Sequence, residues 1–141
     1  MLYVKEYIFR GRRRARGKER RITLLVTLCA AVILLVAADL ISKAAAVSVL
    51  SQTGGALEFI PGLIRFEYHK NTGMAWGLFS NATWVFVVIT IVTGGLIVFI
   101  LLKTLKTMPR NLQLGLALVL SGAIGNLIDR VALGYVRDFI A

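Results

Sequence analysis

Three long apolar runs, separated by charged or polar segments, dominate the chain. They occupy residues 22–38, 84–102 and 112–128, and none of them contains a charged residue. A helix rises 1.5 Å per residue, so about 20 residues are needed to cross the hydrocarbon core of a bilayer. We therefore predict three transmembrane helices, the first and third of which continue a few residues beyond their apolar runs.

The segment between the first two runs, residues 44–80, has the pattern of short β-strands. Turn residues occur at 53–55 and at Pro61-Gly62. Between and after these turns, apolar or aromatic side chains stand at alternate positions, at Leu57 and Phe59 and again at Ile64, Phe66 and Tyr68. A period of two is that of a strand. We predict two or three short strands lying on the membrane surface.

Positive charge is concentrated ahead of the first apolar run. The net charge is +10, and nine of the 17 Lys and Arg residues lie within residues 1–21. Such a head could bind nucleic acid, but beside an apolar span it is typical of the cytoplasmic side of a membrane. Lys103, Lys106 and Arg110 place the second loop on that side too. We expect a cytoplasmic, loosely structured head with a short interfacial helix near residues 3–9, and no nucleic-acid partner.

The head and the first apolar run also have the order of regions found in a signal peptide. The sequence continues through Asp39 and Lys43 without a convincing cleavage site, and further spans follow. We therefore interpret this run as an uncleaved first helix, and residues 22–141 as a membrane-embedded domain. Cys29 stands alone, so it forms no internal disulfide and no metal-ligand pattern, and we interpret it as a packing residue.

Polar residues occur where the apolar runs leave the membrane. Asp39 and Lys43 are spaced i, i+4 and can pair, and an ordinary end-of-helix ion pair is the alternative to a functional role. Asn126 and Asp129, at i, i+3, share a face of the third helix. With the head inside, all of these residues and segment 44–80 lie at the outer surface. Acids in that position indicate a functional site.

Two further features lie on the same predicted surface. In Asn71-Thr-Gly-Met-Ala-Trp-Gly77, the Asn amide could bond backbone or a substrate amide, although a plain turn back into the membrane fits equally well. His69 is expected to have no special role. Asp129 and Asp138 stand nine residues apart, and two acids so close suggest carboxylate chemistry at the membrane surface.

Four blocks of this sequence resemble lipoprotein signal peptidase, the bacterial signal peptidase II. They are Asp39-Leu-Ile-Ser-Lys43, Asn71-Thr-Gly-Met-Ala-Trp-Gly77, Gly122-Ala-Ile-Gly-Asn-Leu-Ile-Asp-Arg130 and Gly134-Tyr-Val-Arg-Asp-Phe-Ile140. The resemblance runs from about Ile22 to the end of the sequence. It implies an α-helical membrane protein with four helices and a small extracytoplasmic sheet. It also implies a monomer in the bacterial cytoplasmic membrane, with the N-terminus cytoplasmic and the active face extracytoplasmic.

The resemblance further implies an aspartyl endopeptidase without a cofactor or a metal. Its substrates would be diacylglyceryl-modified prolipoproteins, cut just before the lipidated cysteine, and membrane lipid would surround it. Asp138 matches one catalytic aspartate. The positions thought to hold the site and position the substrate are Asp39, Lys43, Asn71, Gly73, Gly122, Asn126, Asp129 and Arg130. Met74 and Trp76 stand where Ala and Phe are commoner, which we expect to change only the pocket lining.

The second catalytic aspartate of the family lies in a later motif, Phe-Asn-x-Ala-Asp-Ser, before a fourth span. The printed sequence ends at Ala141, ahead of that motif. Two neighbouring carboxylates push their pKa values apart, which lets one be ionised while the other is protonated. Asp129 is the nearby substitute, but we expect Arg130 to hold it in a structural ion pair.

Two hypotheses therefore stay open. The chain is a lipoprotein signal peptidase represented by an incomplete product or a fragment, or it is a membrane protein that binds lipidated signal peptides without cleaving them. A transporter or channel subunit is a third possibility, but its polar residues should gather near the bilayer midplane.

Overall fold

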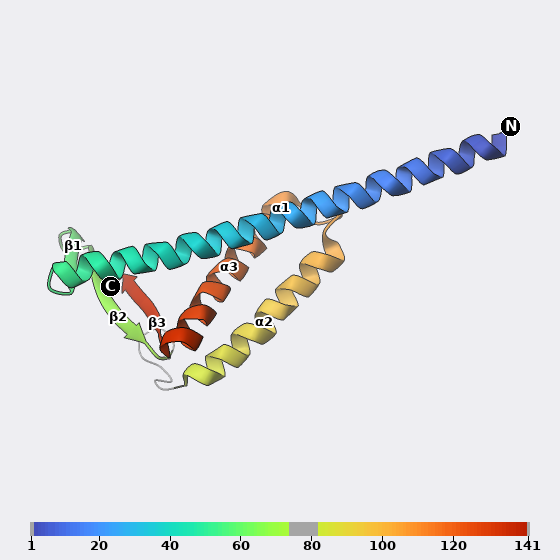
Figure 1. Cartoon of the computed structure of the whole chain (residues 1–141). Helices are drawn as coiled ribbons and strands as arrows, with labels where there is room; N and C mark the ends of the chain where they lie inside the picture. Colours follow the sequence, from blue (N-terminus) through green and yellow to red (C-terminus); the bar gives the residue numbers. More distant parts are fainter. Residues whose placement is uncertain (1, 74–81, 141) are drawn as a thin grey trace.

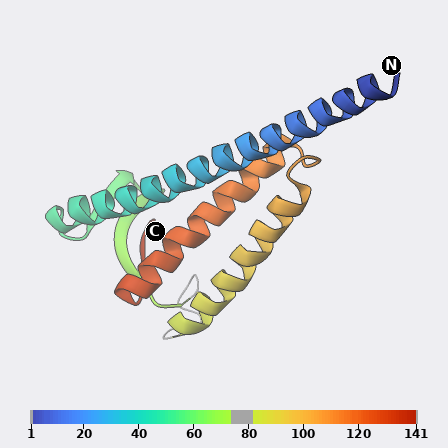
Figure 2. The ribbon, with the colours of Figure 1, turned by 45° about the vertical axis from the view of Figure 1, so that its right-hand side comes forward.

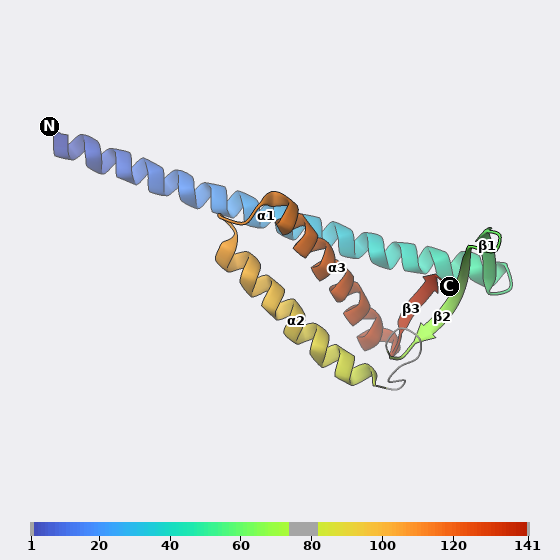
Figure 3. The ribbon, with the colours of Figure 1, turned by 180° about the vertical axis from the view of Figure 1, so that it is seen from behind.

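The computed structural model describes residues 2–73 and 82–140, and within them it contains three long helices and one three-stranded sheet (Figure 1). The elements, in chain order, are α1 (Leu2–Gln52), β1 (Ala56–Ile60), β2 (Ile64–Asn71), α2 (Thr83–Thr104), α3 (Arg110–Leu133) and β3 (Val136–Ile140). The sheet lies beside the C-terminal end of α1, and the α2–α3 turn lies toward the other end of the molecule (Figures 1 and 3).

Helix α1 is one continuous element of 51 residues. The expectation of a loosely structured head is wrong, and so is the expectation that the helix ends near Lys43. Arg, Lys, Glu and Ala are good helix formers, and a helix already formed in the apolar run extends without a new nucleation step. Gly11 and Gly17 each cost about 1 kcal/mol relative to Ala, which is not enough to break it.

The three predicted spans are confirmed as helices long and apolar enough to cross a membrane. The candidate spans are Arg16–Gln52, Thr83–Thr104 and Arg110–Leu133. Much of their outward surface is apolar and exposed, as at Leu34 and Trp84. Helix α3 packs against both α1 and α2 (Figure 2). Apolar side chains that face outward from such helices require a lipid environment rather than water.

The sheet is antiparallel with the strand order β1-β2-β3. Strands β1 and β2 confirm the predicted alternating segment. Strand β3 was not predicted, because its sequence, VRDFI, does not alternate. It forms because Gly134 ends α3 in the left-handed conformation (φ 83°), which turns the chain back along β2. The pairing brings Asp138 opposite His69.

The α2–α3 turn is held by a buried side chain. Gln113, 5% exposed, donates from Nε2 to the carbonyl oxygens of Leu105 (2.9 Å) and Met108 (3.0 Å). Leu105 is itself only 2% exposed. These contacts satisfy two carbonyl groups that the end of α2 would otherwise leave open, so the turn has a fixed position between the two helices.

Candidate active site

Asp129 of α3 is the most buried charged residue among the described side chains, at 1% exposed. Arg137 of β3 donates to both of its carboxylate oxygens, from Nη2 to Oδ1 at 2.6 Å and from Nε at 3.2 Å. The backbone N–H of Arg137 also donates to Asp129 Oδ2 (3.2 Å). A bidentate charged pair has a defined geometry. It therefore fixes the start of β3 against the end of α3.

Lys43 connects helix α1 to the same group. Its ammonium is 2.9 Å from Asp39 Oδ2 and 3.6 Å from Asp129 Oδ2, and it donates to Asn126 Oδ1 at 2.7 Å. Lys43 is 5% exposed. Two carboxylates and two cations, counting Arg137, balance in charge here. Balance and mutual hydrogen bonds are what a buried ionic cluster requires.

The Asp39 carboxylate packs directly on the backbone of α3 at Gly125. A Cβ at that position would collide with Asp39 Oδ2 and would lie 2.9 Å from its Cγ. Only glycine leaves this room, so α1 and α3 can approach closely at the level of the ionic cluster. By contrast, a Cβ on Gly122 would meet no described heavy atom within 4 Å.

Asp138 and Asn71 form a second polar pair, on neighbouring strands. Asn71 Nδ2 donates to Asp138 Oδ2 at 2.7 Å, and Asn71 Oδ1 accepts from the Gly73 N–H at 2.9 Å. Successive strand residues point to opposite faces, so Asp138 and Arg137 lie on different sides of β3. The half-buried Asp138 carboxylate accepts a hydrogen bond from a neutral amide, whereas Asp129 is paired with two cations.

Arg130 follows Asp129 on α3 and is near the acids of both groups. Its guanidinium carbon is 5.4 Å from the centre of the Phe86 ring, a cation–π distance. Both Asp129 and Asp138 interact with its charge. Its Nε is buried and has no hydrogen-bond partner among the residues that the structure describes. A buried donor in that condition is available to an acceptor that enters the site.

An aromatic pair extends the site along the sheet. Tyr68 donates its hydroxyl to the Tyr135 hydroxyl at 3.2 Å, and Lys70 Nζ lies 5.2 Å from the centre of the Tyr135 ring. Burial, followed by the Tyr135 hydrogen bond, raises the pKa of Tyr68 to about 12. The hydrogen bonds to Asp129 raise the pKa of Arg137 above its usual value.

The structure brings most of the sequence-predicted residues to one end of the helices. Asp39 and Lys43 form the pair that their spacing predicts, and Asn126 faces Lys43 rather than lipid. The prediction that Arg130 forms the ion pair with Asp129 is wrong. Consecutive helix residues point about 100° apart, so Arg130 turns toward Phe86, and Arg137 takes its place. Met74 and Trp76 lie outside the described residues.

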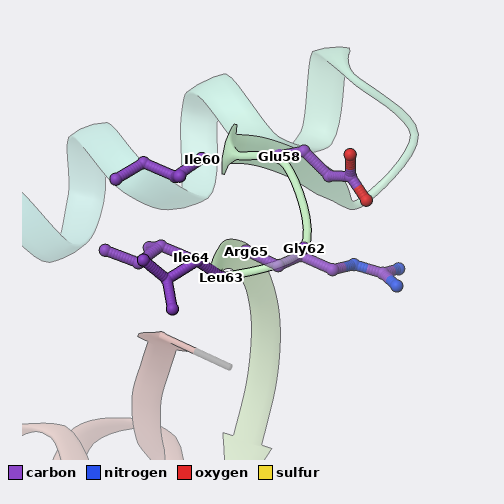
Figure 4. A pocket seen from close by; sticks show the side chains of 6 residues that line it. All are labelled: Glu58, Ile60, Gly62, Leu63, Ile64 and Arg65. Carbon is purple, nitrogen blue, oxygen red and sulfur yellow. The ribbon is translucent and has the colours of Figure 1, made fainter.

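Arg137 and Tyr135 are contributors that the sequence reasoning missed. An Arg beside a suspected catalytic Asp was a signal for Arg137, but its target depends on how β3 folds back on α3. A concavity lies at the β1–β2 turn, lined by Glu58, Ile60, Gly62, Leu63, Ile64 and Arg65 (Figure 4). Its apolar side chains point one way and its two charged ones the other (Figure 4). It holds none of the polar residues described above.

Comparison with known proteins identifies the family. Residues 31–141 match the family described as Signal peptidase (SPase) II. The lipoprotein signal peptidase of Enterococcus faecalis is 43% identical over 107 residues, which are 76% of this chain and 65% of that protein. The protein of the same name from Streptococcus pyogenes serotype M5 is 42% identical over 111 residues, 77% of this chain and 70% of that protein.

Two solved structures of a bacterial membrane enzyme, obtained by the in meso method at 2.3 Å and 1.9 Å, share the fold. They are 32% and 33% identical to this chain, with TM-scores of 0.65 and 0.62. The matches cover 82% and 81% of this chain and 69% and 72% of those chains. The chain belongs to the signal peptidase II family, a family of membrane proteases that process lipoproteins. Its match spans about two thirds of the length of these relatives.

Proposed function

We propose that this chain acts as a lipoprotein signal peptidase, an aspartyl endopeptidase. It would remove the signal peptide of diacylglyceryl-modified prolipoproteins immediately before the lipidated cysteine. It would act at the extracytoplasmic face of a bacterial cytoplasmic membrane. The observation that carries the proposal is the Asn71–Asp138 pair, because a neutral amide holds this carboxylate at the end of the apolar helices, within reach of the charge of Arg130.

Asp138 would be the catalytic carboxylate. Its Oδ2 accepts from Asn71, which would orient the side chain and leave Oδ1 to hold or deprotonate a water. The buried Nε of Arg130 would donate to a substrate carbonyl that enters beside Asp138. The lipid chains of the substrate would remain in the bilayer around the apolar outer faces of the helices, such as the face that carries Trp84.

Asp39, Lys43, Asn126 and Asp129 would act as supports rather than reactants. Lys43 and Asp129 are buried, and the members of the cluster bind one another. Asp129 is 1% exposed and bound by two cations, so it is poorly placed to hold a reacting water. In this proposal, the cluster fixes the relative positions of α1, α3 and β3 so that Asp138 faces the substrate.

The alternative function is binding of lipidated signal peptides without cleavage. One observation favours it: of the two acids first considered for catalysis, Asp129 is committed to Lys43 and Arg137, which leaves Asp138 alone. Because an aspartyl mechanism divides its work between an ionised and a protonated carboxyl, a single carboxylate would bind a peptide but not cut it.

A cleavage assay distinguishes these functions. The purified chain, in detergent, is given a diacylglyceryl-modified prolipoprotein peptide with a fluorescent label, and both binding and cleavage are followed. Asp138→Asn is compared with Glu67→Gln, which neutralises a partly exposed carboxylate of the same sheet, outside the proposed site. Circular dichroism and gel filtration establish that each variant is folded.

Cleavage that is lost in Asp138→Asn and kept in Glu67→Gln would support the peptidase. Retained cleavage in Asp138→Asn would remove Asp138 from the mechanism. Binding without cleavage by the unmodified chain would support the alternative. Equal binding of the peptide with and without its diacylglyceryl group would contradict both.

A further inference from the structure

The net charge of this protein is confined to one end of its spans. The head and the α2–α3 turn, residues 1–21 and 103–110, contain twelve Lys and Arg residues and two acids, Glu6 and Glu19. The rest of the chain contains five basic and five acidic residues. The first group therefore carries the whole charge of +10, while the end with the ionic cluster is neutral overall. This excess of charge has no role in the proposed peptidase site.

The fold joins the two basic segments into one surface. A Cβ placed on Gly17 of α1 would lie 3.9 Å from Lys106 Nζ, so the turn meets the helix at this glycine. All three views show the turn against α1 (Figures 1, 2 and 3). We call the exposed basic residues of this region the inner basic cluster. Its members are Arg16, Lys18, Arg20, Arg21, Lys103, Lys106 and Arg110.

The basic residues of the two segments lie near one another, with little negative charge between them. Arg21 is four residues from Gly17 and lies on the same helix face, toward Lys106. Glu19, the acid within this stretch of α1, is two residues from Gly17 and does not share that face. The turn itself contains no acid between Lys103 and Arg110, and buried Gln113 fixes its position. Cations gathered on two adjoining segments create a region of positive potential that attracts an anion.

The position of the cluster identifies the anion. Arg21 and Lys43 are 22 residues apart on one helix, which is about 33 Å at 1.5 Å per residue. That length matches a hydrocarbon core of about 30 Å, so Arg21 lies where the core ends, at headgroup level. Basic residues there are within a Debye length, about 8 Å, of an anionic leaflet.

We propose that the inner basic cluster is a binding site for the phosphate headgroups of anionic lipids of the inner leaflet, with Arg21 and Lys106 contacting the same headgroup. Nucleic acid is less suited to this site, because Arg21, Lys103 and Lys106 adjoin apolar helix surface that lipid must cover. The proposal goes beyond the peptidase function and does not depend on it, since its test involves no cleavage.

Lipid retention in native mass spectrometry provides the test. The protein, in a neutral detergent, is mixed with phosphatidylglycerol and phosphatidylcholine of the same acyl chains, and the bound lipid is identified. We expect phosphatidylglycerol to bind about tenfold more tightly. Lys106→Gln and Arg21→Gln should each weaken it about fivefold, the effect of one cation beside an anionic surface. If one headgroup bridges the two residues, the double variant loses less than the product of the single effects.

Arg65→Gln is the matched control, since it removes one exposed cation from the neutral end of the protein. It should change phosphatidylglycerol binding less than twofold. An equal effect of Arg65→Gln, or no preference between the two lipids, would overturn the proposal. So would displacement of the lipid by inorganic phosphate at the same concentration, which would indicate a site for free phosphate. If a short single-stranded RNA bound more tightly than phosphatidylglycerol, and this binding were lost in Lys106→Gln, the site would be one for nucleic acid instead.

Discussion

Asp129 and Arg137 are joined by a bidentate ion pair, with Nη2 2.6 Å from Oδ1, although the chain passes from helix to strand between them. This ion pair determines the orientation of both Arg137 and the residue after it, Asp138. Arg137 is held against α3, and Asp138, the next residue, must then point to the other face of β3, where Asn71 meets it. An ionic contact on one side of the strand therefore orients the proposed catalytic group on the other.

Loss of this pair should destabilise the protein strongly. Arg137→Gln removes the bidentate partner of the buried Asp129 and leaves it the longer Lys43 contact (3.6 Å). We expect a loss of about 3 kcal/mol in the free energy of unfolding, the lower end of the range for a broken buried ion pair. Denaturant unfolding in detergent, followed by circular dichroism, measures it. Glu67→Gln breaks the partly exposed Arg65–Glu67 pair (3.1 Å) and should cost less than about 1 kcal/mol. Equal losses of stability in the two variants would contradict the expectation that the buried pair contributes more than the Arg65–Glu67 pair.

The close approach of α1 and α3 makes Gly125 sensitive to the smallest side chain. In Gly125→Ala the new methyl group would occupy the place of the Asp39 carboxylate, so the helices must separate or the Asp39–Lys43 pair must open. We expect a loss of about 1–3 kcal/mol, as for an overpacked core. Gly122→Ala, three residues away in open space, should be neutral or slightly stabilising because alanine favours a helix. Thermal unfolding of both variants tests the contrast.

Asn71 supports two neighbours at once. Asn71→Ala removes the hydrogen bond to Asp138 and leaves the Gly73 N–H without its acceptor, which should cost about 1–3 kcal/mol. Hydrogen exchange should increase at the β2–β3 pairing, where Asn71 lies opposite Val136. His69→Gln changes an exposed residue of the same strand and should stay within about 0.5 kcal/mol. Unchanged exchange in Asn71→Ala would show that the side chain does not hold the strands.

Tyr68 should make stability fall at high pH. Its pKa is raised to about 12 from an ordinary value of 10.0, chiefly by burial, so the folded state favours the neutral phenol. This contribution is complete below pH 10 and is lost as the pH rises from 10 to about 12. The ultraviolet absorbance of tyrosinate, compared between the native protein and Tyr68→Phe, measures the titration. A Tyr68 titration with its midpoint at pH 10 would contradict the expected shift.

The orientation in the membrane can be tested with single cysteines. In a Cys29→Ser background, Glu58→Cys reports the β1–β2 hairpin and Thr107→Cys the α2–α3 turn, both at exposed positions. We expect a membrane-impermeant thiol reagent to label Glu58→Cys in intact cells and Thr107→Cys only after lysis, since the basic turn should be cytoplasmic. The opposite pattern would invert the proposed topology. It would also move the inner basic cluster to the outer leaflet.

The sequence alone determined the spans, the β1–β2 hairpin and the gathering of polar residues at one end. Each follows from local periodicity or from the length of an uncharged run, because a segment must satisfy the membrane or the sheet with its own side chains. The Asp39–Lys43 pair was predictable for the same reason, since four residues on one helix fix their separation.

The tertiary structure alone decided which charges meet. Arg137, rather than the adjacent Arg130, binds Asp129, because β3 folds back on α3 and no local pattern encodes that strand. The contact between Gly125 and Asp39 and the meeting of Gly17 with Lys106 depend on how helices far apart in sequence pack. Sequence spacing reports distance along one element, whereas partners on different elements are set by packing, which is a property of the whole chain.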